Sequence, residues 1–112
     1  MTALGDASKA RYEDRMTEHL RRCFPDQCEK MDEPGIRRII AQGIEHAKRY
    51  NIVTERDVCL FIDLMFIFGE EFDTSPNLPW MSEILTDPHR TDPSRKIDHL
   101  YDVALEVLKQ HA

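Results

Sequence analysis

The stretch that decides the fold is Val58-Cys59-Leu60-Phe61-Ile62-Asp63-Leu64-Met65-Phe66-Ile67-Phe68, which is apolar on every side but one. Such a run can form either a buried strand or a buried helix, and its length and flanks decide between them. It exceeds ten residues, follows the capping sequence Thr54-Glu55-Arg56-Asp57, and ends at Gly69, a residue typical of helix C-termini. The sequence therefore predicts a central apolar helix over residues 55–68.

Three further segments carry apolar residues at three- and four-residue steps, which is the spacing of one helix face. They predict helices near residues 7–24, 34–50 and 93–110, and a shorter helix is expected at 79–85. The sequence shows no internal repeat and no domain boundary. We therefore expect an all-α fold in which residues 1–112 form a single-domain compact bundle of four main helices plus a short fifth.

Prolines and capping residues mark where these helices begin and end. Pro25 disfavours helical conformation in the residue before it and is expected to end the first helix. Asp32 is the expected N-cap of the second helix, and residues 26–32 are expected to form a polar connector. Gly43 lies in the middle of the second helix, where it costs roughly 1 kcal/mol against alanine, so we expect a close helix–helix crossing at this position.

The charge of the chain excludes some classes of partner. Its 112 residues include 15 Lys and Arg against 21 Asp and Glu, a net charge of −6. This balance argues against a nonspecific nucleic-acid binder. Residues 51–112 hold twelve acidic and five basic residues, so this half carries a net charge of −7. It is either a solvated acidic face that keeps the protein soluble or a surface that steers a basic partner.

The same composition bears on location. No segment approaches the roughly 20 apolar residues that a membrane span needs, so we expect no membrane association. The polar start of the chain does not resemble a secretory signal. An odd count of three cysteines fits a reducing compartment better than a disulfide framework. Together these features predict a cytoplasmic protein.

Catalytic motifs are missing from the sequence. It contains no GxSxG, no P-loop, no Gly-rich dinucleotide turn and no HExxH. We therefore expect a protein that is not an enzyme, with no catalytic residues and no cofactor.

A partial metal-ligand pattern lies near the end of the first helix, where His19, Cys23 and Cys28 are closely spaced. A zinc site needs four ligands, which commonly come as two close pairs. The second pair is missing, because Cys59 lies inside the apolar helix and the other histidines are scattered. We therefore predict no metal site, and we expect Cys23 to pack as a small hydrophobic residue.

Asp63 stands alone as a charged residue in the apolar stretch. A buried carboxylate must find a partner or shift its pKa. Asp63 therefore either faces solvent or a loop, where it can bond a backbone group or an arginine, or it is a perturbed acid in a cleft. In the second case the chain is a small metal-dependent or ligand-binding protein that uses Asp63.

An apolar patch lies on a segment that two prolines keep irregular, and it comprises Phe72, Leu78 and Trp80 with the neighbouring Asp73. One reading is that the segment folds back and Trp80 covers the core beside the central helix. The other is a recognition loop in which Trp80 anchors a partner. On the second reading, these four residues and Asp63 are the candidate partner-binding residues.

Residues 50–80 carry letters that resemble a known family. These are Tyr50-Asn51-Ile52-Val53-Thr54-Glu55-Arg56-Asp57, Phe61-Ile62-Asp63-Leu64-Met65, Phe68-Gly69-Glu70-Glu71-Phe72-Asp73 and Leu78-Pro79-Trp80. The pattern resembles small helical accessory proteins encoded beside type VI secretion genes, next to PAAR and VgrG spike proteins and their toxic effectors. In outline the resemblance covers residues 36–108. It implies a cytoplasmic adaptor or co-chaperone that helps to load an effector or spike protein, and it carries no residue-level site.

These observations lead us to expect a non-enzymatic protein-binding module, an adaptor or co-chaperone whose partner is an effector or spike protein. An immunity protein of a secreted toxin is the neighbouring alternative. The metal-dependent or ligand-binding reading through Asp63 is a third. The narrow isoleucine stripe of residues 34–50 also permits a homodimer.

Overall fold

The computed structural model describes the backbone of residues 6–110 and the side chains of residues 10–110. Every regular element in this range is helical. The elements are α1 (Asp6–Cys23), α2 (Pro25–Glu29), α3 (Glu33–Lys48), α4 (Glu55–Phe68), the 3-10 turn η1 (Phe72–Thr74), α5 (Pro79–Leu85) and α6 (Pro93–Gln110). The predicted all-α fold, with four main helices and a short helix at 79–85, is confirmed.

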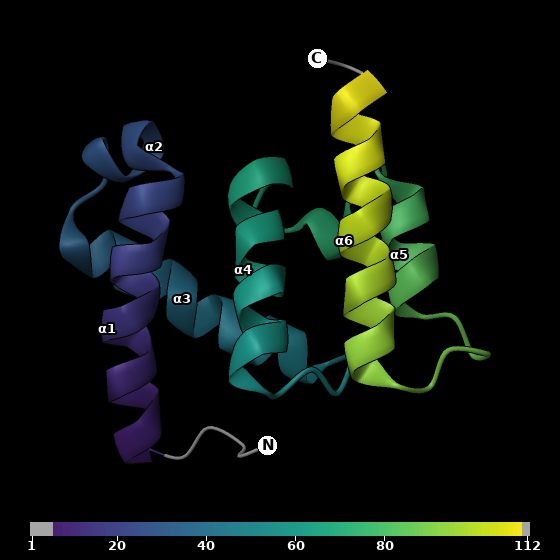
Figure 1. Ribbon diagram of the computed structural model, residues 1–112, viewed down its shortest axis with the longest axis horizontal. Coiled ribbons are helices and arrows are strands. Elements are labelled where there is room, and N and C mark those ends of the chain that lie inside the picture. The colour runs from purple at the N-terminus through teal and green to yellow at the C-terminus, as the bar shows by residue number, and fades with distance from the viewer. Residues whose placement is uncertain (1–5, 111–112) are drawn as a thin grey trace.

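The helix α4 occupies the middle of the molecule. Figure 1 shows it between α1 on one side and α6 on the other, with α3 crossing behind. It packs most extensively against α3 and α6 and less extensively against α1, while α5 packs on α6 and η1. None of the helices between residues 6 and 110 is both long and apolar enough to cross a lipid bilayer.

Both ends of α4 form as the sequence predicts. The Thr54 hydroxyl accepts a hydrogen bond from the backbone N–H of Asp57 at 3.4 Å, which caps the first turn. Gly69 follows the last turn with φ of 110°, a conformation that favours glycine. Between these ends, the buried side chains point to all sides of the helix: Asp57, Val58, Phe61, Ile62, Asp63, Leu64, Met65 and Phe66. The central apolar helix is therefore the centre of the hydrophobic core.

Gly43 lies where α3 crosses α4. A Cβ atom at this position would lie 2.5 Å from Cγ1 of Ile62 and 3.1 Å from Sδ of Met65. Real Cβ contacts are longer than the first of these distances, so only glycine lets the two helices approach this closely. The predicted close crossing is confirmed.

The connector expected at 26–32 contains a short helix instead, α2. Pro25 ends α1 as predicted, yet the fixed φ of proline also suits the first position of a helix, so the same residue starts α2. The helix buries Cys28, and the ring of the preceding Phe24 packs against that of Phe66 at a centroid distance of 5.2 Å. Pro25 therefore ends one helix and starts the next, and the prediction considered only the first of these roles.

The irregular segment between α4 and α5 folds back onto the core. Phe72 is buried in η1, and its ring centroid lies 5.0 Å from that of Phe61 in α4. The ring of Trp80 meets that of Phe68 edge-on at 6.1 Å and is partly buried. Trp80 therefore covers the core beside α4, which was the first of its two readings.

The buried face of α5 is set by Met81 and Leu85. Met81 and Leu85 are fully buried, whereas Trp80 and Ile84 pack at the edge of the core. Residues four apart share a helix face, so Met81 fixes the inward face together with Leu85.

Candidate metal centre

Two helices bring together four side chains that are metal-ligand types. His19 and Cys23 lie one turn apart on α1, and Cys59 and Asp63 lie one turn apart on α4. Side chains four residues apart project from the same face of a helix, so each pair presents its two donors together. We call these four residues the α1–α4 cluster.

Distances within the cluster are short. The Nε2 atom of His19 lies 2.9 Å from Oδ1 of Asp63 and 3.6 Å from Sγ of Cys59. One donor atom from each of these three residues lies within 4.8 Å of the other two. His19 is 40 positions from Cys59 and 44 positions from Asp63, so only the packing of α1 on α4 brings it next to them.

Cys23 lies beside these three residues at the end of α1, but its Sγ atom is not within 4.8 Å of the donor atoms of all three. Its Sγ atom lies 3.8 Å from both ring nitrogens of His19, and the residue is exposed. The expectation that Cys23 packs as a small hydrophobic residue is therefore wrong. It is the last residue of α1, whereas Cys28 in α2 is the cysteine that the core buries.

Asp63 is buried, with 6% of its surface exposed. The expectation of a solvent- or loop-facing position is wrong, because α1 lies over this side of α4 and supplies a histidine. Burial raises the pKa of Asp63, and the hydrogen bond and charge of His19 lower it by a smaller amount. The carboxylate is thus held in a desolvated place by one polar partner.

Cys59 is half-buried beside Asp63. Burial, together with the nearby Asp63 and Cys23, raises the pKa of its thiol to about 12. The thiol therefore keeps its proton at neutral pH unless a cation takes its place.

Two tyrosines border the cluster. Burial raises the pKa of Tyr101 on α6 and of Tyr12 on α1, and the charges of Asp63 and Cys59 act on both in the same direction. The Tyr12 hydroxyl donates to the backbone carbonyl of Glu55 at 3.0 Å and so ties α1 to the start of α4.

The three donor distances measured from His19 are close to those of a tetrahedral site. Zinc bonds of about 2.0 to 2.3 Å place the ligand atoms of a tetrahedral site about 3.3 to 3.8 Å apart. The His19–Cys59 and His19–Cys23 distances of 3.6 and 3.8 Å fall in this range. The 2.9 Å contact between His19 and Asp63 has to open by only a few tenths of an ångström to admit an ion.

The prediction of no metal site rested on a missing second ligand pair. The structure supplies that pair, since Cys59 faces His19 from within the apolar helix rather than being enclosed by hydrocarbon. One sequence feature could have indicated this cluster: each of two predicted helices carries two metal-ligand residues four positions apart. The pairs are His19/Cys23 and Cys59/Asp63. Reading them as partners requires knowing that α1 packs on α4.

The other candidate partner-binding residues are not brought together with Asp63. Phe72 and Asp73 are 1% and 0% exposed, so neither can contact a partner in this conformation. Leu78 and Trp80 are partly buried at the edge of the core. The apolar patch is thus mostly a covering of the core.

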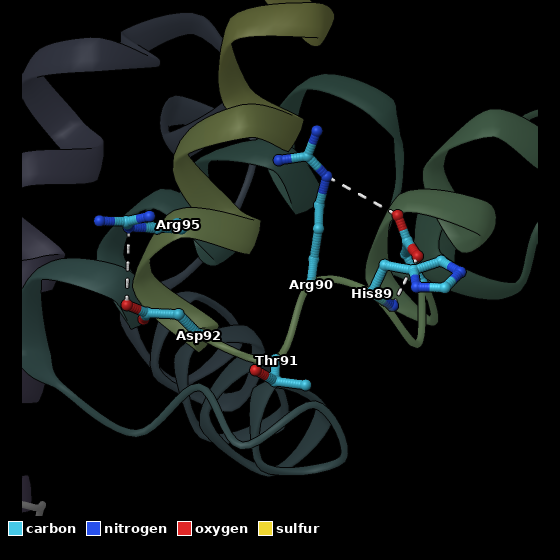
Figure 2. A pocket seen from close by; sticks show the side chains of 6 residues that line it. His89, Arg90, Thr91, Asp92 and Arg95 are labelled. Carbon is cyan, nitrogen blue, oxygen red and sulfur yellow. Dashed lines mark hydrogen bonds and ion pairs between the residues drawn. The ribbon is translucent and has the colours of Figure 1, made fainter.

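A polar depression of about 410 Å³ lies between α5 and α6 (Figure 2). Its lining residues are Asp87, His89, Arg90, Thr91, Asp92 and Arg95. The Nε atom of Arg90 lies 3.7 Å from Oδ2 of Asp87, and the Nε atom of Arg95 lies 3.9 Å from Oδ2 of Asp92. Figure 2 shows the two guanidinium groups turned apart, each toward its own aspartate. These charges pair with one another and do not converge on one point.

No family model, curated protein or solved structure matches this chain.

Proposed function

We propose that this chain binds one divalent transition-metal ion, zinc, at the α1–α4 cluster. The observation that carries the proposal is the convergence of an imidazole nitrogen, a thiol sulfur and a carboxylate oxygen within 4.8 Å, from His19, Cys59 and Asp63. The fourth ligand of the proposal is Cys23, 3.8 Å from His19, whose exposed side chain has to turn toward Cys59 and Asp63 to complete the site.

The donor set selects among metals. Calcium and magnesium take oxygen ligands, so a site with two sulfurs and an imidazole is poorly suited to either. Zinc accepts sulfur, nitrogen and carboxylate oxygen together in tetrahedral geometry. A site closed by four protein ligands is of the structural kind, and its chemical role here is to hold α1 against α4.

Zinc binding is tested by metal content and by cobalt substitution. We expect the purified chain to bind one equivalent of Zn²⁺, and Co²⁺ in its place to give the near-ultraviolet absorption of cobalt–thiolate bonds. Cys59→Ser and Asp63→Asn should weaken binding by more than about tenfold, as loss of metal-site groups does. Cys28→Ser is the matched control, because Cys28 is a cysteine outside the cluster.

Folded wild-type chain that takes up no Zn²⁺ would refute the proposal, as would equal affinity in the Cys59→Ser and Cys28→Ser variants. Circular dichroism of each variant separates a lost site from a lost fold.

A second candidate function is the one that the family resemblance implies, a cytoplasmic adaptor or co-chaperone for an effector or spike protein. The observation that favours it is the outer face of α6, where Leu105 and Leu108 are 42% and 38% exposed. The helix α5, which carries the partly buried Trp80, packs on α6. The net charge of −7 on residues 51–112 would steer a basic partner to this half of the chain.

The adaptor function is tested by capture of the tagged chain from its bacterium, followed by mass spectrometry. We expect a stoichiometric spike protein or effector, lost in a Leu105→Ser/Leu108→Ser variant. Val53→Ser is the matched control, since Val53 is similarly exposed but lies outside α6. Capture of a toxin alone would favour the immunity protein instead, and capture that survives the α6 changes would exclude this face.

A further inference from the structure

A second group of metal-ligand side chains lies at the C-terminal end of α3. His46 is in the last turn of α3, Glu71 precedes η1, and Asp73 is in η1. One ring nitrogen of His46 and one carboxylate oxygen of each acid lie within 4.8 Å of one another. None of these residues belongs to the α1–α4 cluster.

Two atoms of this group are buried without a hydrogen-bond partner. They are Nδ1 of His46 and Oδ1 of Asp73. A buried polar atom left without a partner costs about 1 to 3 kcal/mol, so two of them at one place point to a ligand that supplies the contacts.

The remaining contacts of Asp73 leave this oxygen free. The Tyr50 hydroxyl donates to Oδ2 of Asp73 at 2.8 Å, and the Arg49 guanidinium lies 3.9 Å from the same atom. Both partners therefore approach one oxygen and orient the carboxylate, while the other oxygen, Oδ1, has no partner. The two carboxylates outweigh the single positive charge of Arg49, so the group has a net attraction for a cation.

We propose that His46, Glu71 and Asp73 form a second cation site, which takes a divalent ion of the Mn²⁺ type. One imidazole nitrogen and two carboxylate oxygens, without sulfur, match the harder first-row metals better than the sulfur-containing α1–α4 cluster does. Glu71 is exposed, so water can complete the coordination on its side. The ion would join the end of α3 to the turn that follows α4.

The two sites share no residue and lie on different elements, which allows them to be tested separately. The probe is Mn²⁺, titrated into the full chain carrying Cys59→Ser, which removes a thiol from the α1–α4 cluster. Free Mn²⁺ is counted by electron paramagnetic resonance. We expect one bound Mn²⁺ per chain.

Matched variants in the same background assign the site. His46→Gln and Glu71→Gln should each weaken Mn²⁺ binding by more than about tenfold. Glu70→Gln is the control, because Glu70 is the neighbouring acid, 3.6 Å from Arg38 and outside the group. Glu71 is exposed, so the Glu71→Gln variant tests the site without disturbing the core.

A folded Cys59→Ser chain that binds no Mn²⁺ would overturn this second site, and a bridging water at His46 and Asp73 in a crystal grown with Mn²⁺ would do the same. Equal weakening of Mn²⁺ binding by Glu70→Gln and Glu71→Gln would also overturn it, since that result would mean that the acidic surface as a whole attracts the ion. Each of these outcomes leaves the zinc proposal for the α1–α4 cluster intact.

Discussion

At the scale of single residues, Cys59 makes the proposed zinc affinity depend on pH. Burial raises the pKa of its thiol to about 12, so a zinc ion must displace a proton to bind the thiolate. We expect the apparent affinity to rise by about tenfold per pH unit from this group near neutral pH, measured by competition with a chelator. Cys59→Ser should flatten the profile, and a pH-independent wild-type affinity would contradict the assignment.

Asp63 adds a second pH effect at this scale, on the stability of the metal-free protein. Burial raises its pKa above the ordinary value of 3.8, so the folded state holds the proton more tightly than the unfolded state. The stability that this group contributes is therefore fully present below the unfolded pKa and is lost as pH rises through the folded pKa.

The Asp63→Asn variant isolates that effect. An amide cannot ionise and can still bond His19, so we expect the metal-free variant to be no less stable than wild type at neutral pH, within about 1 kcal/mol. Urea denaturation with a chelator present checks the free energy of unfolding at acid and neutral pH. A loss well beyond 1 kcal/mol would mean that the charged pair itself stabilises the fold.

At the scale of elements, the crossing of α3 and α4 depends on Gly43. A Cβ atom there would overlap the Ile62 side chain at 2.5 Å, which forces a rotamer or backbone shift. We expect Gly43→Ala to destabilise the protein by about 1 to 3 kcal/mol, although alanine is the better helix former by about 1 kcal/mol. Thermal or urea denaturation measures the change.

A double variant tests the stated cause. Ile62→Ala removes the atom that the new Cβ meets, so the double variant should lose less stability than the two single variants predict together. Strict additivity would place the effect of Gly43→Ala elsewhere.

Helix boundaries were the most predictable feature at this scale, and their signals explain why. Thr54, Asp32 and Gly69 act on backbone groups within a few residues, so the local sequence contains the whole interaction. The helix α2 was missed because five residues carry little periodicity and Pro25 serves two helices at once.

At the scale of the whole molecule, the proposed zinc ion links α1 to the central helix. We expect saturating Zn²⁺ to slow amide hydrogen exchange in α1 and to stabilise the protein by about 2.7 kcal/mol at 100 times the Kd. Exchange followed by mass spectrometry measures the protection. Cys59→Ser should abolish the zinc-dependent slowing of exchange in α1. Protection spread evenly over all helices would contradict a local link between α1 and α4.

The sequence by itself determined the helices, the capped and apolar α4 at the centre, and the glycine at the helix crossing. Each of these follows from interactions between residues a few positions apart, or from how completely a segment excludes polar groups. Only the tertiary structure decided the candidate sites. His19 lies beside Asp63, 44 positions away, and His46 in α3 lies near Asp73 in the turn after α4, because the packing of whole helices sets which faces touch. Periodicity shows that a face is buried but does not show which helix covers it.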